Sequence, residues 1–285
     1  MKNLPWYAKL VLALTAFLPL YFMIAAIGSK IGLWSWQVGL GSMTFTAGPI
    51  LVGIAAIAAL IALILGLINW SGRKAEKQDG VKRPRNKAVI VSAVLGLLVP
   101  GAFVVFGMSA SSTAESNPIY DVSTDTGNPP TFSAEVMAER AETESNQVND
   151  YQVPLSELEA FQSLKNDDGA QSLIIQNHAQ IINDIYAELS PLPLAGASKA
   201  DAVAAVAAAM GSMGFVDIRQ DADAGRVEGV AETFWYGFKD DVVARIGENE
   251  IDFRSVSRVG RSDLGANAAR IAELRGKVAA QIGQR

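Results

Sequence analysis

The sequence predicts an α+β protein: three membrane-spanning helices, followed by a soluble domain with an antiparallel sheet and flanking helices. Residues 1–108 contain three long apolar stretches and carry ten Lys and Arg against two acidic residues. Residues 109–285 carry fourteen Lys and Arg against 27 acidic residues, and their apolar residues recur at helix and strand spacings. The resulting charges, +8 and −13, indicate two physical environments within one chain.

Three apolar stretches predict the membrane helices, at about residues 6–27, 47–70 and 88–108. The second and third exceed 20 residues and contain no charged side chain. A helix of this length, at about 1.5 Å per residue, crosses a hydrocarbon core about 30 Å thick. Lys9 lies near the start of the first stretch, where a lysine can reach the headgroups. Because lipid offers the backbone no hydrogen-bonding partner, these stretches are expected to be helical.

The basic residues predict the orientation. Residues 28–45 contain only Lys30, whereas residues 71–87 contain seven basic residues: Arg73, Lys74, Lys77, Lys82, Arg83, Arg85 and Lys87. The positive-inside rule places residues 71–87 and the N-terminus in the cytoplasm. The chain is therefore expected to be a multi-pass protein of the inner (plasma) membrane, with a periplasmic or otherwise extracytoplasmic C-terminal domain. Cleavage near residues 26–28 as a signal peptide is the alternative for the first stretch, and it leaves that domain on the same side.

Composition excludes several kinds of site. The chain has no cysteine and one histidine, His178, which excludes disulfides, thiolate chemistry and multi-histidine zinc sites. The acidic soluble part is a poor partner for nucleic acid because phosphates would repel it. The sequence contains no phosphate-binding or dinucleotide-binding glycine motif, and we expect no cofactor. We also expect no metal site.

The soluble part is predicted to begin with a tether. Residues 109–116 are small and polar, and residues 117–132 are rich in Pro, Asp, Asn and Thr, which favours ordered turns over a regular element. The acidic residues 133–150 predict a mobile or helical surface segment. The domain itself is expected to extend over residues 117–285.

Periodicity predicts the elements that follow. Apolar residues at helical spacing predict an amphipathic helix near 170–189, Ser198 is expected to cap an alanine-rich helix, and Ser262 or Asp263 to cap a final helix that ends near residue 282. Alternating apolar and polar residues predict four antiparallel strands, at 215–219, 226–235, 241–246 and 251–257.

Three stretches carry a family resemblance: NPIYDVSTDTGNPPTF at 117–132, RVEGVAETFWYGFKDDVVARI at 226–246 and IDFRSVSRVGRSDLGANAARI at 251–271. Over roughly residues 115–283 the chain resembles the bacterial domain-of-unknown-function family 1499. The resemblance implies a domain that often follows membrane helices. It implies no reaction, cofactor or catalytic residue.

The densest polar motif predicts a candidate ligand site. Period two places Arg254 and Arg258 on one face of the last strand, and Arg261 and Ser262 follow at the start of the last helix, whose free N–H groups favour an anion. Guanidinium groups gathered there could hold a phosphate or a carboxylate. The alternative is that the arginines pair with Glu228, Glu232 and Asp252 across the sheet, which a domain of net charge −13 favours.

Two further patterns have structural explanations. His178 lies on the apolar face of its predicted helix and is expected to be a core residue, although a Ser-His-Asp triad stays open because its members are adjacent only in space. Residues 221–232 faintly resemble a calcium loop but lack its glycine at position six, which favours a turn between strands.

These patterns favour a non-enzymatic envelope protein. Its outward domain is expected to bind a small anion or lipid headgroup, or to dock to a membrane protein partner. One alternative is an envelope hydrolase that uses carboxylates from 117–132 or 221–232, with Arg258 and Arg261 as stabilising cations. The other is a subunit for assembly of a membrane complex, in which the helices matter more than the domain.

Overall fold

The computed structural model describes residues 4–71 and 86–283. The chain divides into two compact units. The first comprises Met1–Ser111 and Phe234–Gly237, and the second comprises Ser112–Thr233 and Phe238–Arg285. The basic residues from Arg73 to Arg85, on which the predicted orientation depends, lie outside the described residues.

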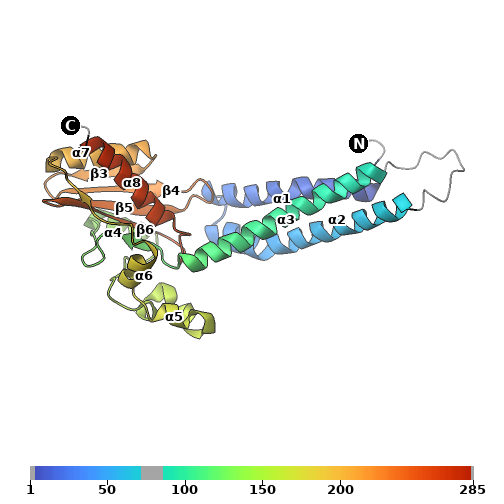
Figure 1. Ribbon diagram of the computed structural model, residues 1–285, viewed down its shortest axis with the longest axis horizontal. Helices are drawn as coiled ribbons and strands as arrows, with labels where there is room; N and C mark the ends of the chain where they lie inside the picture. Colours follow the sequence, from blue (N-terminus) through green and yellow to red (C-terminus); the bar gives the residue numbers. More distant parts are fainter. Residues whose placement is uncertain (1–3, 72–85, 284–285) are drawn as a thin grey trace, which may run out of the picture. The chain divides into compact units, whose positions relative to one another are not determined.

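The first unit contains the predicted membrane helices (Figure 1). They are α1 (Trp6–Lys30), the π-helical η1 (Gln37–Ala47) with α2 (Gly48–Ser71), and α3 (Asn86–Ser116). Within residues 4–71 and 86–283, three helical stretches are long and apolar enough to cross a membrane: Trp6–Lys30, Gln37–Asn69 and Lys87–Ser116. The presence of three long apolar N-terminal helices agrees with the prediction.

Small residues allow the first unit's helices to approach closely. Ala59, Ala62 and Ala93 are fully buried in a cluster with Val11. A Cβ added at Gly96 would lie 2.3 Å from the side chain of Val11, so a larger residue would push α1 and α3 apart. Small residues serve this purpose in membrane helix pairs because lipid supplies no hydrophobic drive between helices.

The helices are longer than the sequence predicts. The second span starts at Gln37 because η1 is continuous with α2, and α3 continues through residues 109–116, the expected tether. This segment contains neither glycine nor proline, so nothing in it interrupts a helix. The helix ends where the Asn117 side chain donates to the Thr113 carbonyl (2.8 Å) and Pro118 cannot donate a backbone hydrogen bond.

The second unit is built on an antiparallel sheet. Its strands follow the order β1-β6-β5-β4-β3, and β2 also pairs with β6. Four of the strands agree closely with the alternating segments of the sequence, and β1 and β2 are additional. The bounds are β1 (Asp121–Ser123), β2 (Leu192–Pro193), β3 (Val216–Asp221), β4 (Arg226–Glu232), β5 (Lys239–Ile246) and β6 (Glu250–Ser257).

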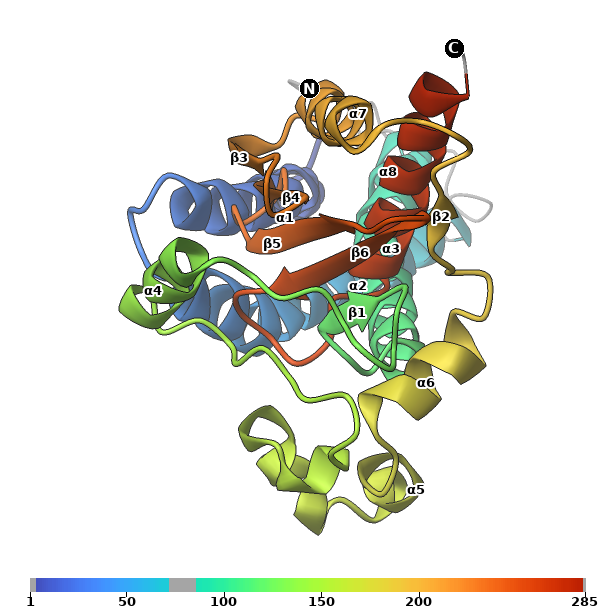
Figure 2. The same ribbon diagram turned by 90° about the vertical axis from the view of Figure 1, so that its left-hand side faces the viewer.

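Two helices cover one face of this sheet, α7 (Lys199–Ser212) and α8 (Ala266–Ile282), and α4 (Ala134–Glu142) lies on the other face (Figure 2). The apolar core includes Val227, Phe253 and Ile271, all fully buried. As predicted, Ser198 caps α7, because its hydroxyl accepts a hydrogen bond from the Asp201 amide. The α+β prediction is therefore confirmed.

The prediction of a single helix near residues 170–189 is wrong. The structure has two short helices there, α5 (Gln171–Ile174) and α6 (His178–Ile185). Asn177 is extended and forms a capping box with Gln180, and this box starts a new helix where the apolar spacing alone predicts continuity. Short 3-10 helices precede α5, at Leu155–Glu157, Glu159–Asn166 and Asp168–Ala170.

The start of the last helix also differs from the prediction. α8 begins after Gly265, whose φ of 81° is in the left-handed region that glycine adopts readily. The carboxylate of Asp263 nevertheless accepts hydrogen bonds from the amides of Gly265 (2.8 Å) and Asn267 (2.7 Å). Asp263 thus satisfies free N–H groups at the helix start, although it is not the residue directly before the helix.

Candidate functional site

The two faces of β6 carry different chemistry, as its alternation predicts. Asp252 and Arg254 lie opposite Arg245 and Val243 of β5, on the face away from α7 and α8. Ile251 and Phe253, which alternate with them along β6, are fully buried in the apolar core. We call the first side the arginine face, defined by Arg140, Arg245, Arg254 and Arg258 with the carboxylates that they contact: Asp121, Asp125, Glu139, Asp241 and Asp252.

Arg254 makes the most buried ion pair of the arginine face. Its Nε and Nη2 donate to the two carboxylate oxygens of Asp121, at 2.9 and 2.8 Å. Its Nη2 also donates to the Asn149 carbonyl (2.9 Å), and its Nη1 to the Pro130 carbonyl (3.3 Å). Burial would raise the pKa of Asp121, but the Arg254 guanidinium outweighs burial and holds that pKa below its usual value. Arg254 therefore joins β6 to β1 and to two loops.

His178 lies beside this pair in an aromatic environment. Its ring stacks on Tyr151 (centroids 5.3 Å apart) and meets Phe161 edge to face (5.9 Å). Asn149 Nδ2 lies 3.1 Å from His178 Nε2. Burial lowers the pKa of His178 to about 4, although the nearby Asp121 carboxylate acts in the opposite direction. A neutral, fully buried imidazole agrees with the prediction of a core histidine.

Asp241 is shared by two arginines of the arginine face. Arg258 donates to both of its oxygens, at 2.9 and 2.6 Å, and Arg140 of α4 forms a buried ion pair with the same carboxylate. Arg258 also lies 3.9 Å from Glu139, and the Asp241 hydrogen bond raises the pKa of its guanidinium. These contacts bind α4 to the sheet.

Arg261 and Ser262 lie apart from these pairs. Arg261 is exposed and donates to the Ser163 hydroxyl at 3.3 Å, and within the described part of the chain it forms no ion pair. Ser262 donates to the Asn117 carbonyl (2.6 Å). Burial raises the pKa of Asp263 to about 6, and this carboxyl group occupies the helix start that the sequence suggests for an anion.

The structure therefore does not gather Arg254, Arg258 and Arg261 around one position. Arg254 and Arg258 bind different aspartates, and these partners are not the Glu228, Glu232 and Asp252 that the pairing alternative names. Asp252 instead pairs with Arg245 at 2.7 Å. Anion binding by these arginines stays a prediction.

The structure adds a polar cluster that the sequence did not suggest, on the face of α8. Arg270 Nη2 donates to Asp240 (2.6 Å) and its Nη1 to the Ser255 hydroxyl (3.0 Å). Asn267 is fully buried and donates to the Tyr120 carbonyl (2.8 Å) and the Ser257 hydroxyl (3.0 Å). The serines that alternate along β6 were the available signal, since a serine in a core position needs a polar partner.

Carboxylates from both segments of the hydrolase alternative have structural contacts. Asp125 pairs with Arg245 (2.8 Å), and Asp221 pairs with Arg226 (3.1 Å) while it accepts from the Ala224 amide (2.9 Å). The calcium-like segment 221–232 thus comprises the end of β3, the turn at residues 222–225 and the whole of β4. Across residues 4–71 and 86–283 no group of three or more His, Asp or Glu side chains is arranged to hold a metal ion.

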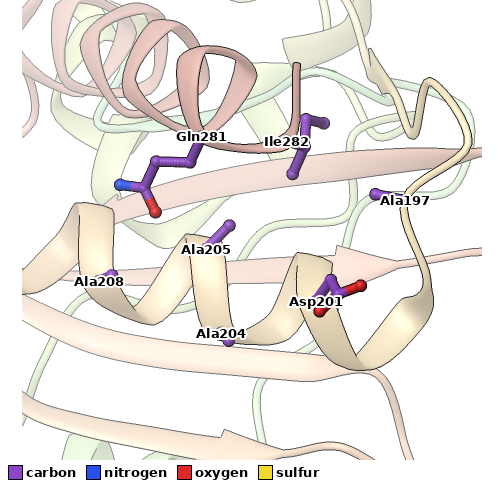
Figure 3. Close-up of a pocket in the computed structure, with 7 residues that line it drawn as sticks. All are labelled: Ala197, Asp201, Ala204, Ala205, Ala208, Gln281 and Ile282. Carbon is purple, nitrogen blue, oxygen red and sulfur yellow. The ribbon is translucent and has the colours of Figure 1, made fainter. Parts of the chain in front are cut away.

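A groove of about 310 Å³ lies between α7 and the end of α8 (Figure 3). Its lining consists of four alanines with one carboxylate, one amide and one apolar side chain: Ala197, Asp201, Ala204, Ala205, Ala208, Gln281 and Ile282. The Asp201 carboxylate would repel an anion, so the groove does not match the anionic ligand that the sequence suggests.

The second unit is thus an α+β domain whose sheet packs against α7 and α8 on one face and carries the arginine face on the other, and it follows three helices able to cross a membrane. Residues 121–278 match the family described as Protein of unknown function (DUF1499), and the chain belongs to that family. No curated protein and no solved structure matches the chain.

Replacing Arg254 with methionine should lower the free energy of unfolding by about 3–5 kcal/mol, because Asp121 would stay buried without its partner. The control Arg261→Met removes an exposed side chain and should cost roughly 0–1 kcal/mol. The double variant Asp121→Leu/Arg254→Met should recover part of the loss. Pulse proteolysis of the detergent-solubilised protein across a urea series measures all three. Equal midpoints for Arg254→Met and Arg261→Met would contradict the assigned role.

The His178→Phe variant should change the pH dependence of stability. With a pKa of about 4 in the fold and 6.5 unfolded, neutral His178 contributes stability in full above pH 6.5. That contribution, on the order of 3 kcal/mol, is lost as the pH falls toward 4. Phenylalanine does not titrate, so the urea midpoint of the His178→Phe variant should fall less between pH 7 and pH 4 than that of the wild type. If the urea midpoints of the variant and the wild type changed in parallel with pH, His178 would not be held neutral in the fold.

Proposed function

We propose that this protein is a non-enzymatic envelope protein of the inner (plasma) membrane, whose C-terminal domain faces outward and binds a small anion or lipid headgroup. The observation that carries the proposal is that guanidinium groups pair with the carboxylates of the arginine face. Its buried carboxylates are held by guanidinium groups, as in the pair of Asp121 with Arg254 and the pair of Asp241 with Arg258. Carboxylates in such pairs are poor general acids and bases.

The ligand surface would be centred on Arg261. This guanidinium is exposed and contacts one neutral side chain, Ser163. Arg258 lies three residues earlier, and an anion would have to compete with Asp241 for it. Arg261 is therefore the group best able to accept a phosphate or carboxylate in bidentate geometry, with Arg258 as the second contributor.

Docking to a membrane protein partner is the second candidate function. The three apolar helices are compatible with it, because exposed apolar residues along them, such as Ile57, Leu98 and Val105, can contact another protein as well as lipid. This candidate needs no ligand at Arg261.

Enzyme fusions test the orientation. Alkaline phosphatase fused after Ser116 should be active, because the positive-inside rule places this position outside the cytoplasm. The same enzyme fused after Lys77 should be inactive. Activity in cells is the measurement, with a fusion protein blot as the control for expression. Activity only after Lys77 would reverse the proposed orientation.

A thermal-shift titration tests the ligand. Inorganic phosphate and glycerol phosphate should raise the melting temperature of the detergent-solubilised protein. An anion concentration 100 times its Kd should add about 2.7 kcal/mol to the free energy of unfolding. Arg261→Met should abolish the shift. The matched variant Arg275→Met should keep it, because Arg275 binds the Ser190 carbonyl elsewhere on the domain.

A wild-type protein that responds to neither anion would remove the ligand part of the proposal and leave partner docking. A response that persists in Arg261→Met would move the site elsewhere.

A further inference from the structure

The connection between β4 and β5 presents two aromatic rings at its surface. Phe234 is 73% exposed and Trp235 is 51% exposed, and their rings meet edge to face with centroids 4.8 Å apart. Other exposed apolar side chains of the domain, such as Ile175 and Val216, have no aromatic ring. Adjacent exposed rings of this size are costly in water, because each carries a large apolar area.

The backbone of this connection is constrained. The Thr233 amide donates to the Phe238 carbonyl (2.8 Å), and the Phe238 amide donates to the Thr233 hydroxyl (2.9 Å). Between them Tyr236 has a φ of 61°, which is uncommon for a residue with a bulky side chain. Strained conformations persist where the surrounding structure fixes them, and they often serve a function. The turn holds Phe234 and Trp235 in place.

The compact unit that contains the three apolar helices also contains Phe234–Gly237. Inside this unit, Lys30 Nζ donates to the Phe234 carbonyl (3.2 Å) and lies 5.4 Å from the centre of the Phe234 ring. The Tyr236 hydroxyl lies 2.6 Å from the Thr44 hydroxyl. Lys30 ends the first span, and a lysine at the end of a membrane helix lies at the headgroup level.

From these observations we propose that the tip of the β4–β5 hairpin, Phe234 and Trp235, inserts into the interfacial layer of the membrane that the helices cross. Tryptophan and other amphipathic rings are enriched in this layer, where one end of the ring is apolar and the other is wet. The inference does not depend on anion binding at Arg261.

The absence of cysteine from the chain allows a direct test. Phe234→Cys and Trp235→Cys, each labelled with a small environment-sensitive fluorophore, would be reconstituted as full-length protein in phosphatidylcholine nanodiscs. Half of the nanodiscs would also contain phosphatidylcholine with a nitroxide on its headgroup. Ala222→Cys, at the exposed turn before β4, is the matched control, and Val105→Cys in the third span reports lipid access.

The label at position 234 or 235 should lose fluorescence when nitroxide lipid is present, by an amount close to the loss for the label at position 105, which reports lipid access. The label at 222 should keep its fluorescence. Unchanged fluorescence at both 234 and 235 would overturn the proposal and assign the rings to contacts with protein. Equal losses at 222 and 234 would also overturn it, because the whole domain would then touch lipid without a specific role for the hairpin.

Discussion

The soluble domain depends on one buried ion pair, between Asp121 and Arg254. Both side chains are almost completely removed from solvent, which costs several kcal/mol per charge unless all polar atoms are satisfied. Tyr151 donates a further hydrogen bond to Asp121 (2.6 Å), and the Asn149 amide another (3.0 Å). The short strand β1 and the loop near Asn149 are therefore held by charged hydrogen bonds as well as by packing.

The arginine face extends the same principle to α4. Asp241 accepts from Arg140 and Arg258, so a helix and a strand distant in sequence share one carboxylate. Such a face favours one arrangement of α4 against the sheet, since a buried charge is strongly destabilising when it lacks its partner. It also explains why so many charged residues of the domain are structural and so few remain for a ligand.

The sequence predicted the parts of the structure that have a local period. The three long apolar helices, the alternation of β6 and the cap at Ser198 follow from spacing and composition, and the structure bears them out. The partners of the arginines could not be predicted, because Asp121 lies 133 residues from Arg254 and a side chain's charge does not say which opposite charge it will meet. The break at Asn177 was missed because a capping box competes with an otherwise continuous apolar period.

The alternation along β6 has a consequence for how the chain avoids misfolding. A shift by one residue against β5 would move Asp252 and Arg254 into the apolar layer and expose Ile251 and Phe253 to guanidinium groups. Every side chain of a strand changes face in such a slip. The shifted register would bury unpaired charges on one face of the sheet and place apolar side chains on the charged face. Neighbouring registers are therefore strongly disfavoured, and β6 adopts a single register.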